Sequence, residues 1–385
     1  MPRLNRKLAV LATLAILGCS ADDDGGVVGG DPLPEGGGGA GGYGTGGGET
    51  GGGGSSSSGT GGGGGGGDDC PPDVICVDSF PYVNDNDTTG GNATLDGYSC
   101  APTTNESGPE RVYRVDVAEG GLLVASLDNL GVDVDVDVHI LEQLDPGTCL
   151  DRGHWDAAAL VPAGRYWVIV DSWVDGSVSQ EGAYELTLGL TTPSSHLSVG
   201  LDPNVLDAGL QGFAVGWEQG DTIELEYGII DYTMPSIEPR LFVLDLRLGD
   251  VLYAELVSHG EGSQNPNDLT LTGNMSNLSG SHASSVGMVV TAETYNGSNG
   301  YSLRLDGLEV GFNDNDRPRA IVVHAADYAT QSFINQYGYL GRSWGCPAVD
   351  PAVNTQLIDT IKEGRLLLKY FDDQDWLSSS VYVGP

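Results

Sequence analysis

A glycine-rich stretch near the amino end limits how much of this sequence can contribute to a hydrophobic core. Residues 20–68 hold 26 of the chain's 61 glycines and a run of four serines, with almost no large apolar side chains. Such a segment cannot bury enough apolar surface to offset the entropy lost on folding. We therefore expect residues 19–68 to form a disordered tether, and the hydrophobic cores to be built from the remaining 69–385.

The first 18 residues resemble the signal peptide of a bacterial lipoprotein. Three basic residues precede an apolar run, 8–17, which is too short to span a bilayer as a helix. The following I-L-G-C is similar to a lipobox, which implies cleavage before Cys19 and attachment of diacylglyceryl to its sulfur. The alternative is an ordinary secretory signal with a chance cysteine.

This resemblance predicts a protein of the cell envelope that meets the membrane through its lipid alone. Ser20 and Ala21 do not resemble an inner-membrane retention signal, so we expect the outer membrane, facing the periplasm. No later segment reaches the length of apolar sequence that a membrane helix needs. The sequence provides no prediction of the oligomeric state.

The charge of the chain excludes one class of partner. The formal net charge is −38, and loss of a signal with three basic and no acidic residues takes it to −41. A chain this acidic repels nucleic acid and anionic lipid surfaces, so neither is expected to bind.

The cysteines fit an oxidising compartment. Cys70, Cys76, Cys100 and Cys149 fall in one region and can pair in three ways. We favour Cys70 with Cys76 and Cys100 with Cys149. Cys346 is then left as a thiol, which makes it the cysteine of interest.

Residues 69–192 alternate between apolar and polar residues in short runs separated by Gly, Pro, Asn and Asp. This pattern predicts a β-sandwich. The order of the runs resembles the pre-peptidase C-terminal (PPC) type of bacterial sandwich, which implies an accessory, non-catalytic module. The expected strands are 110–117, 121–127, 132–141, 164–172 and 182–190.

One of these runs carries a ladder of carboxylates. Asp133, Asp135 and Asp137 are two residues apart, so on a single strand they would share one face and could bind calcium. The alternative is a solvated strand face opposite four buried valines, at 132, 134, 136 and 138. We favour the solvated face.

Other polar residues of this region are also predicted to be structural. A second acidic stretch, residues 84–87, could bind calcium, but a simple loop is favoured. His139 and His154 have no partners at ligand spacing. We therefore predict no metal site, with calcium at an acidic segment as the single cofactor considered.

Residues 196–385 predict a second domain, mostly β with short helices. The boundary falls in the polar segment 191–198, which contains Pro193. Expected strands are 240–247, 251–258, 286–294, 301–306 and 319–324, with a closing strand at 365–371. Expected helices are 204–217, 328–337 and 351–362.

A thiol and an imidazole lie in adjacent segments of this domain. Cys346 lies in the Gly-flanked turn G-R-S-W-G-C-P, and His324 ends the apolar run A-I-V-V-H. A cysteine activated by a neighbouring imidazole is the minimum equipment for acyl transfer. The alternative is that each is an ordinary buried core residue.

Several motifs in order resemble the L,D-transpeptidase (YkuD-like) catalytic domain, in its murein-associated subgroup. They are R-L-F-V-L-D-L with V-S-H-G-E-G-S, S-H-A-S-S-V-G with T-A-E-T-Y-N-G, G-Y-S-L-R-L-D-G-L-E with G-F-N-D-N, R-A-I-V-V-H-A-A-D-Y, and G-R-S-W-G-C-P. The resemblance implies a mixed β-fold and a cysteine nucleophile.

Carried over by position, the resemblance makes Cys346 the nucleophile and His324 the base. Ser343 and Gly345 would shape the turn, and the backbone N–H groups of Gly345 and Cys346 would stabilise the oxyanion. Trp344 stands where the better-known pattern has histidine, and we expect it to shield the thiol. Candidates for substrate binding, each of which could instead be a surface or packing residue, are His259, His282, Tyr301, Arg304, Arg342 and Trp344.

The implied reaction acts on peptidoglycan stem peptides. The family cleaves the bond after the third-position diamino acid and passes the acyl group to an amine, forming a crosslink. An L,D-carboxypeptidase, with water as acceptor, is the nearest alternative. A non-catalytic, wall-binding lipoprotein is the alternative from another class.

Overall fold

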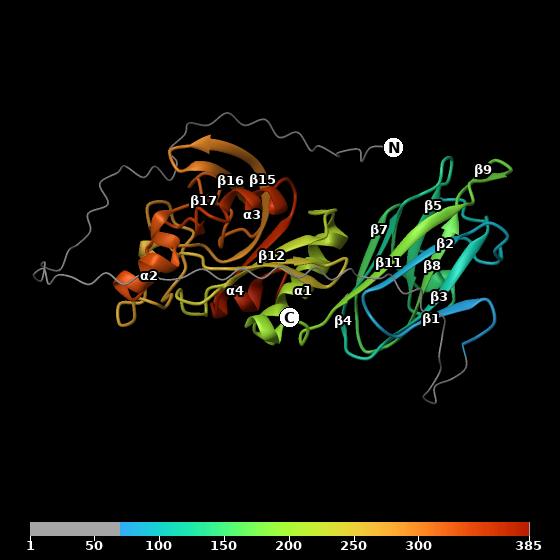
Figure 1. Ribbon diagram of the computed structural model, residues 1–385, viewed down its shortest axis with the longest axis horizontal. Coiled ribbons are helices and arrows are strands. Elements are labelled where there is room, and N and C mark those ends of the chain that lie inside the picture. The colour runs from blue at the N-terminus through green and yellow to red at the C-terminus, as the bar shows by residue number, and fades with distance from the viewer. Residues whose placement is uncertain (1–69, 385) are drawn as a thin grey trace, which may run out of the picture. The chain divides into compact units, whose positions relative to one another are not determined.

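The computed structural model describes residues 70–384 (Figure 1). The expected signal peptide at 1–18, the lipidated Cys19 and the tether at 19–68 lie outside the described residues. Within residues 70–384, no helix combines the length and the apolar character that crossing a membrane requires. The described chain is mainly β with short helices, which is the predicted fold class.

Two antiparallel-rich sheets form the sandwich, drawn in blue to green in Figure 1. Within the described residues, a five-stranded sheet has the order β1-β3-β8-β5-β6 and a four-stranded sheet the order β2-β11-β4-β7. The first comprises β1 (Val74–Val77), β3 (Glu110–Val117), β8 (Gly164–Ser172), β5 (Val136–Leu141) and β6 (Cys149–Gly153). The second comprises β2 (Tyr82–Asp87), β11 (Ala183–Thr191), β4 (Gly121–Asp128) and β7 (Asp156–Val161).

The sandwich core follows from alternation along these strands. Side chains two residues apart share a face, so Val136, Val138 and Ile140 of β5 all point inward and are fully buried. They pack with Val168 and Val170 of β8 in one apolar cluster. A disulfide joins Cys100 to Cys149, with 5.6 Å between the Cα atoms, and Cys70 and Cys76 are also disulfide-bonded.

Two expectations for the acidic segments are wrong. The run 132–141 is not one strand: β5 begins at Val136, Val132 is 92 % exposed, and Asp133 has a φ of 61° in the left-handed region. Residues 84–87 are not a loop but part of β2, which pairs with β11. The valines and carboxylates of the ladder therefore do not divide into one buried and one solvated face.

The C-terminal domain is built on a mixed sheet, drawn in yellow to red in Figure 1. Among residues 196–384, the sheet has eight strands in the order β14-β13-β12-β19-β15-β16-β17-β18. They are β14 (Asp250–Glu255), β13 (Leu241–Asp245), β12 (Glu226–Asp231), β19 (Leu366–Tyr370), β15 (Gly287–Gly297), β16 (Gly300–Gly307), β17 (Val322–Ala325) and β18 (Ala348–Val349).

Strand β19 occupies the middle of this sheet. The expectation of a closing strand at 365–371 has the right residues, but β19 pairs in parallel with β12 and antiparallel with β15. A strand buried on both sides reads as a continuous apolar run, and L-L-L-K-Y fits that description. An apolar run of this kind does not indicate which strands pair with it on either side.

Helices cover both faces of the sheet. Leu366 and Leu368 of β19 belong to the apolar cluster of α1 (Pro203–Gln219), whereas Leu367 belongs to the cluster of α3 (Asn354–Ile361). Helix α1 begins at the Asp202 cap and ends at Gly220, which has a φ of 78°. It thus spans the predicted helix 204–217 and a little more.

The other helices are shorter than expected or were not expected. Helix α2 (Gln331–Tyr337) starts late because Thr330 caps it by accepting a hydrogen bond from the Phe333 N–H. Helix α3 spans only the middle of the predicted 351–362. Neither helix α4 (Gln374–Ser379) nor strand β12 is among the predicted elements. Asp373 caps α4 by accepting a hydrogen bond from the Trp376 N–H.

Candidate active site

Strand pairing brings the segments of His324 and Cys346 together. His324 lies in β17, whose Cα partner in β18 is Ala348, two residues after Cys346. The His324 N–H also points to the carbonyl of Pro347, at 3.4 Å. Because paired parallel strands lie about 4.8 Å apart, the histidine and the turn that carries the thiol are direct neighbours.

The imidazole of His324 is oriented for use as a base. Its Nδ1 lies 2.9 Å from the carbonyl oxygen of Ala325, which can only accept, so Nδ1 carries the proton and Nε2 has a free lone pair in the neutral ring. Burial lowers the pKa of His324 below its ordinary value, and the bond to Ala325 only partly opposes this effect. The ring is therefore neutral at pH 7.

Cys346 is a thiol with no exposed surface. Its Sγ lies 3.7 Å from the Ala320 carbonyl oxygen, and the residue packs in the apolar cluster that contains Val322 and Val323. A peptide carbonyl can reach this sulfur only after covering side chains move. The site in this structure is thus closed.

The turn before the thiol needs a glycine. Gly345 has a φ of 111°, and a Cβ there would lie 2.6 Å from the Ala283 carbonyl oxygen. Ser343 closes the turn, since its hydroxyl donates to the Cys346 carbonyl at 2.6 Å and accepts from the Gly345 N–H at 3.1 Å. The Gly345 N–H, expected as an oxyanion donor, is therefore engaged within the turn.

A buried ion pair lies behind the thiol. Lys369 of β19 and Asp316 are 1 % and 0 % exposed and bonded to each other, and Ser285 is bonded to both, at 2.6 Å each. Burial lowers the pKa of Lys369, while Asp316 and the Cys346 sulfur act in the opposite direction. The ammonium thus lies within electrostatic range of the sulfur.

A second buried cation lies near the site. Arg240 donates to the carbonyl oxygens of Val257 and Met234 and to His259, and its guanidinium lies 5.2 Å from the ring centre of Tyr232. Burial lowers the pKa of Arg240 to about 10, so it remains charged at pH 7. Arg240, Lys369 and Asp316 are not among the predicted site residues. For Lys369 alone a signal was available, namely a charged residue within an apolar strand.

The candidates for substrate binding divide into two groups. Tyr301 donates to Asp359 at 2.7 Å, and Arg304 pairs with Glu293 and lies over the Tyr295 ring, so both make structural contacts. Four others lie at the thiol turn: Arg342 and Trp344 belong to it, His259 is bonded to it through its backbone, and His282 stacks on Trp344. Trp344 is 46 % exposed and stacks on His282, with 4.5 Å between ring centres.

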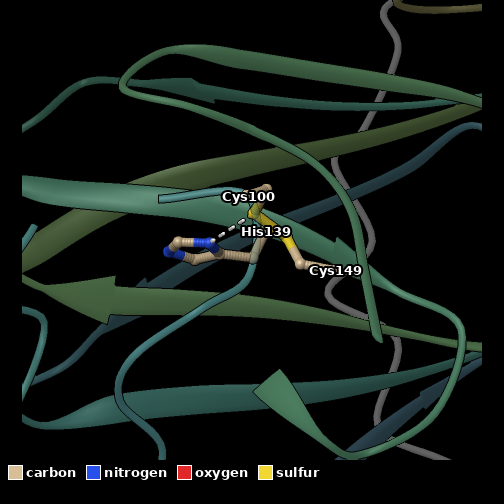
Figure 2. Close-up of side chains that lie close together, drawn as sticks. All are labelled: Cys100, His139 and Cys149. Atoms are coloured by element: carbon tan, nitrogen blue, oxygen red, sulfur yellow. Dashed lines mark hydrogen bonds between the residues drawn. A yellow bond between two sulfur atoms is a disulfide. The ribbon is translucent and has the colours of Figure 1, made fainter. Parts of the chain in front are cut away.

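The sandwich holds a separate polar cluster around its disulfide. Figure 2 shows His139 beside the Cys100–Cys149 bridge, with its Nδ1 4.0 Å from the Cys100 Sγ. The ring stacks on Tyr98, with 3.8 Å between ring centres, and its Nε2 lies 2.5 Å from the Glu106 carboxylate. His139 is thus a structural residue, as expected.

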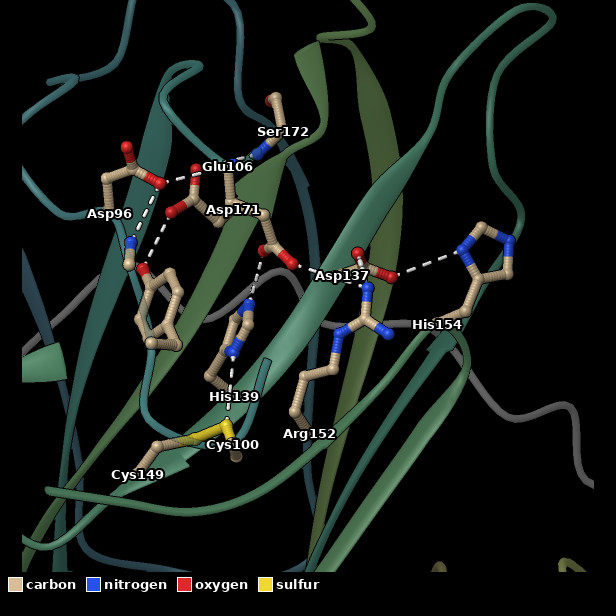
Figure 3. A network of polar contacts seen from close by, with 12 residues as sticks. Asp96, Cys100, Glu106, Asp137, His139, Cys149, Arg152, His154, Asp171 and Ser172 are labelled. Atoms are coloured by element: carbon tan, nitrogen blue, oxygen red, sulfur yellow. Dashed lines mark hydrogen bonds and ion pairs between the residues drawn. A yellow bond between two sulfur atoms is a disulfide. The ribbon is translucent and has the colours of Figure 1, made fainter. Parts of the chain in front are cut away.

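The network extends through charged side chains to the surface (Figure 3). Arg152 bridges Glu106 and Asp137, and Asp137 also contacts the ring of His154 at 3.2 Å. The expectation that His154 has no ligand-like partners is wrong, because its Nδ1 lies 3.2 Å from Asp135 as well. Contacts from distant parts of the chain created this cluster.

This cluster does not fit calcium. Of the three ladder residues, Asp133 lies outside it, while Asp137 contacts Arg152 and His154. Calcium takes six to eight oxygen ligands, whereas a guanidinium and an imidazole present nitrogens to these carboxylates. The stretch 84–87 is no better suited, since Asn84 and Asn86 bond to the Tyr113 hydroxyl within the sandwich.

A comparison with known proteins finds a family match within the C-terminal domain. Residues 198–370 match the family model of the L,D-transpeptidase catalytic domain (YkuD_2). No curated protein matches the chain.

Solved structures with similar chains include L,D-transpeptidases. The L,D-transpeptidase LdtMt1 in complex with imipenem is 12 % identical, covering 78 % of this chain and 96 % of its own, with a TM-score of 0.24. An L,D-transpeptidase from Mycobacterium smegmatis is 11 % identical with the same coverage and TM-score. The pre-peptidase C-terminal domain of a Bacillus anthracis collagenase is 16 % identical over 31 % of this chain and 99 % of its own, with a TM-score of 0.22.

Proposed function

We propose that this chain, whose residues 198–370 match the L,D-transpeptidase catalytic domain, is a peptidoglycan L,D-transpeptidase that acts through Cys346. The observation that carries the proposal is the pairing of β17 with β18, which holds the oriented base His324 beside the turn of a thiol. The substrate is a stem peptide with a diamino acid at its third position and a D-residue at its fourth.

The first half-reaction forms an acyl-enzyme. His324 Nε2 takes the proton of the thiol, and the sulfur attacks the carbonyl carbon of the diamino acid. The C–N bond to the D-residue breaks, the imidazolium returns the proton to the leaving amine, and a thioester remains. Lys369 acts electrostatically on Cys346, and an ammonium there would favour the thiolate, because opposite charges attract strongly where water is excluded.

The second half-reaction releases the acyl group. The amine of a second stem peptide attacks the thioester carbon, the C–S bond breaks, and the thiol regains a proton through His324. Water in the same position would give the L,D-carboxypeptidase reaction, and no feature of the site favours one acceptor. The buried thiol and base argue against a purely wall-binding role, since a binding module has no need of an oriented imidazole beside a turn that carries a thiol.

Intact-mass spectrometry of the full chain tests this function. Incubation with a synthetic stem tetrapeptide should add the mass of the tripeptide acyl group, and Cys346→Ala should remove the adduct while circular dichroism stays unchanged. An added amine acceptor should give a crosslinked product, and its absence should give free tripeptide. Stem peptide that binds without any adduct or turnover would contradict the enzymatic proposal and favour wall binding.

The cellular place of the reaction is part of the same proposal. A lipid on Cys19, with the segment 19–68 as tether, would hold the domain within reach of the wall at the outer membrane. Mass analysis of the amino-terminal peptide from detergent-extracted protein tests the lipid. A Cys19→Ala variant should leave the membrane fraction, and its retention there would contradict lipid anchoring.

A further inference from the structure

The inference concerns His259, in the loop that follows β14. Its backbone is joined to the turn of the nucleophile, since the His259 carbonyl accepts from the Ser343 N–H at 3.1 Å and Gly260 forms a bridge with Ser343. The side chain is 1 % exposed. His259 is therefore held in place by its backbone bond to Ser343, which lies three residues before Cys346 in the chain.

The protonation of this ring follows from its partner. Nδ1 lies 2.9 Å from an Nη2 of Arg240, and a guanidinium can only donate. Nδ1 must therefore accept, so the single proton of the neutral ring is on Nε2. Burial, together with the charges of Arg240 and Arg342, lowers the pKa of His259 to about 3, so the ring stays neutral at any pH at which the protein would work.

Nε2 is then a donor that lacks an acceptor. The atom is buried, and in the part of the chain that the structure describes no group accepts its hydrogen bond. Buried donors are nearly always paired in folded proteins, and an orphan costs free energy that a bound ligand can recover. The arrangement is that of a site whose acceptor arrives with the substrate.

The surrounding charge favours an anionic acceptor. Arg240 is fully buried behind the ring, and Arg342, exposed on the turn, is close enough to act on the ring electrostatically. Two guanidinium groups and one N–H donor match a carboxylate better than a neutral carbonyl. No carboxylate of the described residues bonds to His259.

We propose that His259 and Arg342 bind the terminal carboxylate of the D-residue that leaves the stem peptide. This inference rests on the proposed function, which places the scissile carbonyl at Cys346. The leaving residue is the next along the peptide, and consecutive Cα atoms are about 3.8 Å apart, so its carboxylate lies within one residue length of the attacked bond. His259 is a substrate-binding residue, and Arg240 is a positioning residue that holds its tautomer.

Matched peptides test the inference on the full chain. Three tetrapeptides are compared, each with a diamino acid that has a side-chain carboxylate: the free acid, the C-terminal amide, and a peptide amidated instead at that side-chain carboxylate. The measured quantity is the rate of adduct formation at Cys346 by intact mass. Wild type should prefer the acid over the C-terminal amide by about 10- to 100-fold, the range expected for one charge-assisted recognition, and should accept the third peptide like the acid.

Three variants locate the preference. His259→Phe removes the Nε2 donor and should bring the acid-to-amide ratio close to one. His259→Gln retains a donor near the Nε2 position and should restore part of the ratio. Arg342→Gln, at an exposed position where folding is not at risk, should lower the ratio, whereas Arg165→Gln on β8 of the sandwich should leave it unchanged.

The outcomes separate this inference from the function on which it rests. If wild type forms no adduct with either the acid or the C-terminal amide, the proposed function fails and the inference fails with it. If both peptides form adducts at equal rates, or if the ratio survives both His259→Phe and Arg342→Gln, the function stands and the inference is wrong. If the C-terminal amide reacted as fast as the acid and only the third peptide reacted more slowly, recognition would lie at the diamino acid. The assignment to the leaving residue would then be wrong.

Discussion

The sandwich network around Glu106 and the buried His259 of the C-terminal domain differ in how their polar groups are bonded. In the sandwich, Glu106, Asp137 and His139 are all bonded to other side chains, in a network that the disulfide adjoins. In the C-terminal domain, His259 has one nitrogen bound by Arg240 and the other without an acceptor.

The difference distinguishes architecture from function. Carboxylates and an imidazole that are bonded to one another specify the packing of their own strands. A buried donor that lacks an acceptor carries a free-energy cost that a bound molecule can offset. We therefore expect substitutions in the sandwich network to act on stability, and substitutions at His259 to act on activity.

The base His324 should give the largest effect and the sharpest break between the regions. His324→Asn keeps a donor for the Ala325 carbonyl but removes the Nε2 lone pair. We expect adduct formation at Cys346 to slow by about 10²- to 10⁴-fold, the usual contribution of a general base, with little change in urea unfolding. His154→Asn in the sandwich should leave the rate of adduct formation unchanged. A comparable loss of rate in that variant would contradict the assignment of the effect to His324 as the base.

The ion pair behind the thiol should give the next largest effect. Lys369→Met leaves Asp316 as an unpaired carboxylate in the core, and we expect a loss of about 3–5 kcal/mol in the free energy of unfolding. The measurement is urea denaturation of the full chain. The double variant Lys369→Met/Asp316→Leu should recover most of the loss, and an equally unstable double variant would show that packing rather than charge is at fault.

The dependence of stability on pH should differ in sign between the regions. Burial raises the pKa of Asp171 in the sandwich from 3.8 to about 9, so the folded state holds a proton that the unfolded state loses between these values. Its contribution is present below pH 4 and is lost as the pH rises toward 9. For His259 the folded pKa of about 3 lies below the ordinary 6.5, so its contribution is present above pH 6.5 and is lost as the pH falls toward 3.

Urea unfolding at pH 4, 6 and 8 measures both trends. The stability of wild type relative to Asp171→Asn should fall with rising pH, by at most about 1.4 kcal/mol per unit, and relative to His259→Gln it should fall with decreasing pH below 6.5. If both stability differences changed in the same direction with pH, the opposite pKa shifts of Asp171 and His259 would be contradicted.

The stacked pair over the turn should give the smallest effect. Trp344 is half-exposed and contacts His282 face to face, so Trp344→Ala should cost about 0.5–1.5 kcal/mol in stability. Thermal melting measures this loss. A loss of several kcal/mol would mean that Trp344 is part of the core and not a cover.

Local patterns predicted much of the fold, because alternation and capping act over a few residues. Strands β3, β4, β8 and β11 were expected within a residue or two of their ends, as was helix α1. The failures are long-range. The carboxylate ladder looked like one strand, yet Asp137 is buried because Arg152 and His154 reach it from β6 and the residues that follow.

The same division holds at the site. Cys346 and His324 could be selected because each lies in a distinctive local motif. Arg240 and His259 are 19 residues apart, and Lys369 and Asp316 are 53 apart, so nothing in their own segments indicates that they meet. The partners of Tyr301 on α3 and of Arg304 on β15 were not predicted either, because they come from other segments of the chain.

The central position of β19 has a consequence for biosynthesis. The strand ends at Tyr370, yet it joins β12, which is translated about 140 residues earlier, to β15. When the chain folds from its amino end, β12 and β15 each present an unpaired edge until residues 366–370 are in place. The C-terminal domain therefore completes its sheet only after its last strand has been made, whereas all strands of the sandwich are encoded upstream.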